Sequence, residues 1–178
     1  MKQSSQSGFT LIEILVVIAI IGLISSAVFL NLAAARTKGR DARRKADLVQ
    51  LQTALEIYFN SNGSYPDTGG SWHAVAGTCG GSFDFDGPDG YIPNLAPTYL
   101  GILPDDPKPS TDVCSGYNYR SDGVNYKLIS NAVSGTGGPE TFPTASDTFY
   151  DAARPTTAWM VTNNPAATNT CPSGTTCW

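Results

Sequence analysis

The sequence predicts an α+β protein in which one long N-terminal α-helix packs on a small antiparallel β-sheet head. Three observations carry this prediction. No charged residue occurs in residues 14–35, and the segment that follows has apolar residues at helical spacing. The rest of the chain is rich in turn-forming residues and holds short runs of alternating apolar and polar residues, which is typical of a small sheet with long loops.

Residues 9–32 are predicted to form a transmembrane helix. The charge-free run spans 22 positions, and a helix needs roughly 20 apolar residues to cross a bilayer. Glu13 lies near the start of this run. Because an intramembrane carboxylate is costly, we expect Glu13 to have a partner.

Residues 33–61 are predicted to continue the same helix in amphipathic form. Asn60-Ser61-Asn62-Gly63 is expected to end it, with Gly63 as a left-handed cap, and Pro66 forbids its continuation. The apolar stripe of this half is expected to bury itself against the head. Its members recur three or four residues apart: Ala42, Ala46, Val49, Leu48, Leu51, Leu55 and Tyr58.

The charges divide the chain into three parts. Residues 36–45, here called the basic segment, hold six of the eleven basic residues and one acid, whereas residues 46–178 carry a net charge of −9. This acidity argues against a nucleic-acid-binding head. The basic segment is expected to be a solvated helix face, with contact to anionic lipid or nucleic acid as the alternative.

The head, residues 62–178, is predicted to contain a β-hairpin. Residues 117–120 and 125–129 alternate aromatic or apolar with polar side chains, and Asp122-Gly123 lies between them. Residues 157–162 read as a further strand, and residues 135–153 read as loop.

All four cysteines follow the apolar run. If the head lies outside the cytoplasm, disulfides are expected, and three pairings are possible. We favour Cys171–Cys177, which closes a short loop, together with Cys79–Cys114. A zinc site is disfavoured because the sequence has no Cys-x-x-Cys pair and one histidine, His73.

No catalytic site can be assembled from the sequence. The chain lacks a Gly-x-Ser-x-Gly motif and a nucleophile–base pair for His73, so we predict that it is not an enzyme. Asp84, Asp86 and Asp89 lie on a turn with Gly87 and Gly90. Calcium prefers oxygen ligands on loops of this kind, and a solvated acidic turn is the alternative.

The N-terminus resembles one known family. Gly8-Phe9-Thr10-Leu11-Ile12-Glu13 before a long apolar run is similar to the class III leader of type IV pilins and type II secretion pseudopilins. The small residue precedes the apolar run, the reverse of an ordinary secretory signal. Asn62-Gly63-Ser64-Tyr65-Pro66 is similar to the region where the helices of major pseudopilins end.

This resemblance implies roles for residues 1–8, the prepilin leader, and for the first helical residues. A prepilin peptidase would cleave between Gly8 and Phe9, and Phe9 would be N-methylated. Glu13 would pair with the Phe9 amine of a neighbouring subunit, although a pair within one chain is also sterically conceivable. The resemblance also implies calcium in a later loop of the head, where Asp112 and Asp122 would be nearer ligands.

The function implied is that of a structural filament subunit, in a type IV pilus or a type II secretion pseudopilus. Its partners would be copies of itself, other pilins, the prepilin peptidase, the inner-membrane assembly platform and membrane lipid. The precursor would sit in the inner membrane with its head outside the cytoplasm, and the filament would be periplasmic or at the cell surface. The alternative is a membrane-anchored extracytoplasmic binding or adhesin module that does not polymerise.

Overall fold

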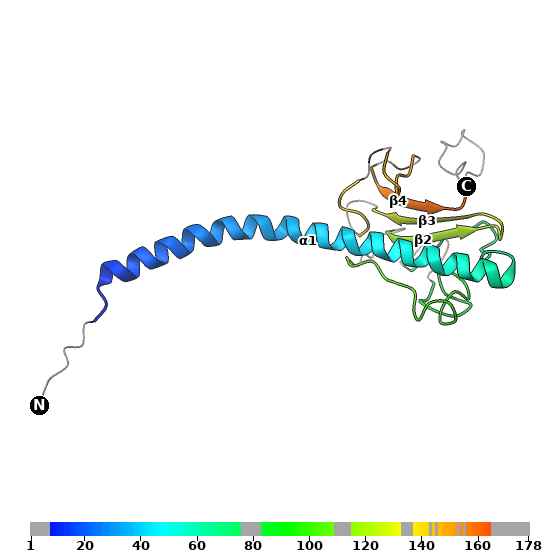
Figure 1. Cartoon of the computed structure of the whole chain (residues 1–178), viewed down its shortest axis with the longest axis horizontal. Coiled ribbons are helices and arrows are strands. Elements are labelled where there is room, and N and C mark those ends of the chain that lie inside the picture. The colour runs from blue at the N-terminus through cyan, green and yellow to red at the C-terminus, as the bar shows by residue number, and fades with distance from the viewer. Residues whose placement is uncertain are drawn as a thin grey trace, which may run out of the picture. The chain divides into compact units, whose positions relative to one another are not determined.

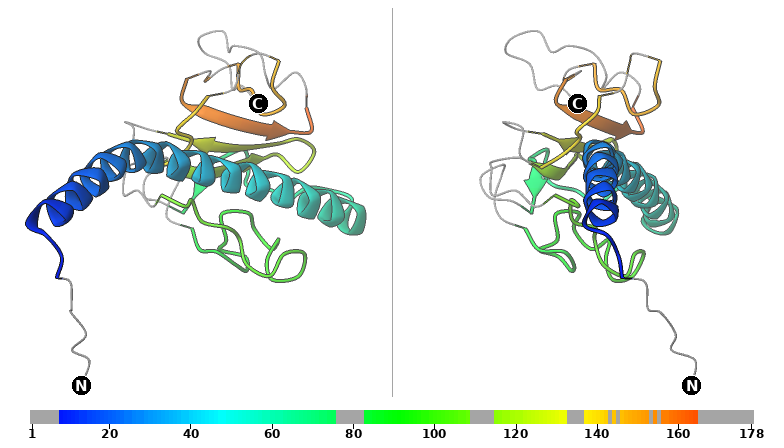
Figure 2. Two further views of the ribbon diagram at one scale, coloured as in Figure 1. Left: turned by 60° about the vertical axis from the view of Figure 1, so that its left-hand side comes forward. Right: turned by 90° about the vertical axis from the view of Figure 1, so that its left-hand side faces the viewer.

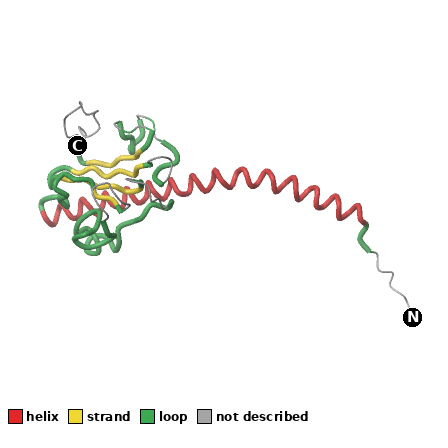
Figure 3. Tube along the Cα trace, turned by 180° about the vertical axis from the view of Figure 1, so that it is seen from behind, coloured by secondary structure: helices red, strands yellow, loops and turns green. Residues whose placement is uncertain are grey.

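The computed structural model describes residues 8–75, 83–108, 115–132, 137–142, 144, 146–152, 154 and 156–164, without the side chains of residues 27–31. They form one helix and four strands: α1 (Leu11–Asn62), β1 (His73–Ala74), β2 (Gly116–Ser121), β3 (Tyr126–Asn131) and β4 (Ala158–Thr162) (Figures 1 and 3). The α+β prediction is therefore confirmed. The chain divides into two compact units, Met1–Thr37 and Lys38–Trp178, and α1 contributes residues to both.

The helix ends where the sequence predicts. Gly63 has a φ of 74°, in the left-handed region, and its N–H donates to the Phe59 carbonyl at 2.8 Å. Glycine takes up this conformation at little cost, so it can satisfy a carbonyl at the end of the helix.

The sheet is antiparallel throughout, in the order β1-β2-β3-β4. β2 and β3 form the predicted hairpin, paired from Gly116↔Asn131 to Ser121↔Tyr126. The Asp122 carboxylate closes the turn by accepting the N–H groups of Val124 and Asn125, at 3.0 and 2.7 Å, and these bonds lower its pKa. β1 was not predicted because two residues are too few to show an alternating pattern.

Residues 38–62 of α1 lie along one face of the sheet (Figure 2). The core combines helix residues Leu48, Leu51 and Leu55 with an aromatic sheet face. Most strand residues are buried on both faces of the sheet. The sheet residues that share the core are Tyr117, Tyr119, Tyr126, Leu128, Trp159 and Val161.

The predicted helix stripe is half wrong. Leu48, Leu51 and Leu55 are buried, but Ala42, Ala46 and Val49 are exposed. Successive residues of an α-helix are rotated by about 100° about its axis, so the leucines and the other three residues lie on different sides of α1. The core covers the side of the leucines, and the side of Ala42, Ala46 and Val49 is exposed.

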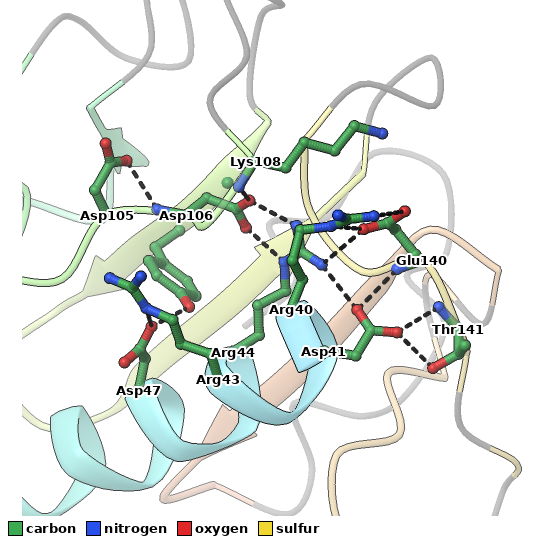
Figure 4. Close-up of polar contacts among 12 residues, drawn as sticks. Arg40, Asp41, Arg43, Arg44, Asp47, Asp105, Asp106, Lys108, Glu140 and Thr141 are labelled. Carbon is green, nitrogen blue, oxygen red and sulfur yellow. Dashed lines mark hydrogen bonds and ion pairs between the residues drawn. The ribbon is translucent and has the colours of Figure 1, made fainter. Parts of the chain in front are cut away.

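A buried arginine joins the helix to a distant loop. Arg44 is fully buried and donates two hydrogen bonds to the Asp106 carboxylate, at 2.7 and 2.8 Å, and one to Asp41 at 2.8 Å (Figure 4). Burial disfavours the Arg44 charge, but the hydrogen bonds and charges of Asp106 and Asp41 outweigh it and raise the pKa of the guanidinium. This pair is bidentate, the geometry in which arginine binds carboxylates most strongly.

A second loop reaches the same part of the helix. Arg40 makes two hydrogen bonds to the Glu140 carboxylate, one of them 2.8 Å long. In return, Asp41 accepts the backbone N–H groups of Glu140 and Thr141, at 3.1 and 2.8 Å (Figure 4). Residues 38–45 are thus held by two loops that lie far along the chain.

The expectation of a solvated basic segment is therefore wrong for half of its cations. Arg40 and Arg44 bind carboxylates of the head, and the Lys45 ammonium lies 5.0 Å from the centre of the Trp159 ring. Arg36, Lys38 and Arg43 are exposed, as a solvated face requires.

We predict that Arg44→Met destabilises the full-length chain by about 3–5 kcal/mol, because it leaves the buried Asp41 and Asp106 carboxylates without their cation. Denaturant unfolding in detergent would measure the change. The control is Arg43→Met. Its side chain is 62% exposed and lies 3.8 Å from Asp47, so it should cost less than about 1 kcal/mol. Equal losses for the two variants would refute the role assigned to Arg44.

Acid should weaken the Arg40–Glu140 pair in a defined range. The hydrogen bonds from Arg40 lower the pKa of Glu140 from 4.5 to about 2. A lowered folded-state pKa adds stability above the unfolded value, and this stability is lost as the pH falls from 4.5 towards 2. Thermal melts of wild type and Glu140→Gln should therefore differ at pH 7 and converge in this range. A constant difference would contradict the prediction.

Candidate functional site

The functional site expected from the sequence is the start of α1. Thr10 and Glu13 form a reciprocal cap there. The Thr10 N–H and hydroxyl each donate to the Glu13 carboxylate at 2.8 Å, and the Glu13 N–H donates to the Thr10 hydroxyl at 3.3 Å. This is the capping box, in which a threonine before the helix and a glutamate three residues later satisfy each other's backbone donors.

Glu13 therefore has a partner within its own chain. Sequence reasoning missed Thr10, although Thr-x-x-Glu before an apolar run is the signal of a capping box. Both hydrogen bonds from Thr10 end on Oε2 of Glu13. Within the described residues, Oε1 of Glu13 accepts no hydrogen bond, so it can receive a second donor without breaking the cap.

The surface around this cap is apolar. Phe9 is 85% exposed, and the large apolar side chains from Leu11 to Ile24 are exposed on all sides of the helix. A soluble monomer seldom exposes so much contiguous apolar surface, so something other than this chain's head must cover it. Gly8 comes directly before Phe9 and its Cβ position is open.

No helix among the residues whose side chains are described is both long enough and apolar enough to cross a membrane.

The candidate aspartates that the structure describes do not come together as a metal site. Among the described residues, no three histidine, cysteine or acidic side chains form a group that could hold a metal ion. Asp84, Asp86 and Asp89 are exposed on a turn closed by backbone bonds, in which the Asp84 N–H donates to the Asp89 carbonyl at 2.8 Å. Asp122 supports the β2–β3 turn. Asp112 lies outside the described residues, and calcium stays a prediction.

The remaining sequence candidates are the cysteines and His73. Cys79, Cys114, Cys171 and Cys177 all lie outside the described residues, so their pairing stays a prediction. His73 stacks on Phe83 with ring centres 3.7 Å apart, and burial lowers its pKa. A neutral stacked imidazole is typical of a packing residue.

Known proteins share the N-terminal motif. Residues 3–29 match the family model described as the prokaryotic N-terminal methylation motif. This match includes Gly8, Phe9 and Glu13, the residues singled out from the sequence.

Similar curated proteins carry the name type II secretion system core protein G. The one from Aeromonas hydrophila is 41% identical over 68 residues, and the one from Klebsiella michiganensis is 43% identical over 68 residues. Each alignment covers 38% of this chain and 48% of the relative. The relative from Vibrio cholerae is 39% identical over 67 residues, which is 38% of this chain and 46% of its own.

The chain thus spans about half the length of the curated relatives that it matches. No solved structure matches it. The methylation motif and these relatives nevertheless agree with the family expected from the residues around Gly8. In the part that they match, the chain is similar to type IV pilins and type II secretion pseudopilins.

Proposed function

We propose that the chain is the precursor of a structural filament subunit and has no catalytic role. The observation that carries this proposal is the methylation motif of residues 3–29, which coincides with a capped helix whose apolar surface is uncovered. A helix of this kind needs either lipid or other helices around it. The precursor would use lipid, and the filament would use copies of the chain.

The maturation steps follow from the motif. A prepilin peptidase removes residues 1–8 by cutting between Gly8 and Phe9, and Phe9 is then N-methylated. Residues 9–32 form the membrane helix and later the filament core, residues 33–61 continue the helix, and residues 62–178 form the head. The precursor is anchored in the inner membrane with its head outside the cytoplasm, where an assembly platform and other pilins join it.

The capping box suggests how Glu13 acts in assembly. Cleavage creates a positive amine at Phe9, one residue before the cap. Oε1 of Glu13 can accept a hydrogen bond from the Phe9 amine of a neighbouring subunit, while Oε2 keeps its hydrogen bonds to Thr10. Two opposite charges in a low-dielectric helix bundle stabilise each other only when both are present. The pair would therefore set the register between neighbouring helices.

The relatives favour the pseudopilus over the type IV pilus, because the matching proteins are named for type II secretion. The alternative, a membrane-anchored binding or adhesin module that does not polymerise, keeps the same helix but needs no assembly charge.

Mass spectrometry of the mature protein separates these two readings. We expect a chain that begins at Phe9 and carries one N-methyl group. A mature protein that retains residues 1–8 would exclude the filament route and favour the anchored module.

Two substitutions of Glu13 separate its charge from its capping role. Glu13→Gln removes the charge but can still complete the capping box, whereas Glu13→Ala removes both. If the inter-subunit ion pair drives assembly, both variants should lower the yield of sheared filaments by about tenfold or more at equal protein levels. A wild-type yield for Glu13→Gln would refute the ion pair and leave Glu13 with a helix-capping role.

A further inference from the structure

One side of α1 carries a row of exposed residues, of which Val49 also lines a hollow with Phe149 and Met160 of the head. Lys38, Ala42, Ala46, Val49, Thr53 and Ile57 are exposed and recur three or four residues apart, so they share one side of the helix. We call this set the outer helix face. Val49 and Ile57 are each 49% exposed, and the exposed Arg43 flanks them. The surface is therefore mixed: it carries Lys38 at its start, small apolar residues and Val49 in its middle, and the exposed Glu56 and Asn60 towards its end.

Among the described residues, the exposed lysines and arginines all lie on α1. Residues 46–107 contain no lysine or arginine. Of the lysines and arginines that the structure describes, those that are exposed lie at Arg36, Lys38 and Arg43. Arg40 and Arg44, on the same helical segment, already bind carboxylates of their own head. Lys38 and Arg43 are exposed, and Arg43 keeps one long contact with Asp47, at 3.8 Å.

A complementary surface lies elsewhere on the same head. Asp84, Asp86, Asp89 and Asp105 are all exposed. We call them the acidic lobe. Two backbone segments bring them together, because the Leu103 N–H donates to the Phe85 carbonyl at 2.9 Å. Ile102, beside this lobe, is 64% exposed. The lobe is acidic, whereas the start of the outer helix face is cationic.

We infer that the outer helix face of one copy docks on the acidic lobe of the next copy. This inference rests on the proposed function and adds the head-to-head contact of the filament. Anionic lipid would match Lys38 and Arg43 but would leave the acidic lobe without a partner, whereas a second copy satisfies both surfaces at once. Two different patches that complement each other make a heterologous contact, which generates a helical filament when it does not close into a ring.

Paired charge reversals test this contact in the full chain, expressed with its assembly proteins. Lys38→Glu with Arg43→Glu reverses the helix face, and Asp86→Lys with Asp89→Lys reverses the lobe. Each double variant should lower the yield of sheared filaments by about tenfold, because attraction becomes repulsion. Expressing the two double variants in one chain should restore most of the yield. Asp67→Lys is the control, an exposed acid that belongs to neither surface, and should leave the yield unchanged.

The outcomes distinguish this contact from the proposed function. If wild type makes no filaments, the proposed function fails and the contact fails with it. If wild type assembles and the combined variant is no better than its parents, the contact is refuted. A loss that appears only in the Lys38 and Arg43 variant, without rescue, assigns those cations to anionic lipid. Unchanged melting temperatures of the variants show that folding is not the cause.

Discussion

The fastening of α1 to the head depends on the buried ion pair between Arg44 and Asp106. These residues are 62 positions apart, and Arg44 is fully buried. Ionic groups are expensive to bury, so the pair is favourable only with near-ideal geometry and further hydrogen bonds. Asp41 supplies one such bond to Arg44 and accepts two from the backbone of the Glu140 loop. One helical segment therefore fixes two loops.

The charge of Glu13 is stabilised in a different way from the charge of Arg44. Arg44 is buried and fully engaged by carboxylates of its own chain, whereas Glu13 is exposed and engaged on one oxygen only. The first arrangement stabilises a single folded unit. The second leaves a carboxylate oxygen available at the end of a helix that is apolar on every side. The chain thus contains one polar cluster whose hydrogen bonds are made within the head and its helix, around Arg44, and one that can accept a further donor, at Glu13.

Local signals in the sequence predicted the parts of the fold that depend on near neighbours. The Gly63 cap and the hairpin at Asp122 follow from residues within one turn of each other. The burial of Arg44 could not be read in this way, because its partner belongs to a distant loop. The same holds for Val49, which lies beside the core stripe in sequence but faces away from the core. An aspartate can either close a turn or bind a metal ion, so the sequence could not decide between these roles for Asp122. In the structure its carboxylate accepts the backbone N–H groups of the turn.

In the proposed filament, the exposed groups would contribute two kinds of interaction to assembly. Apolar contact along residues 11–24 is strong but non-directional, because every side of that helix is alike. Register must therefore come from charges, and they occur at two levels: Glu13 at the helix start, and Lys38 and Arg43 where the helix meets the head. Exposed charge pairs add little affinity each, but they penalise wrong alignments. In the proposed filament, the helix would therefore supply cohesion, and the exposed charges of Glu13, Lys38 and Arg43 would supply alignment.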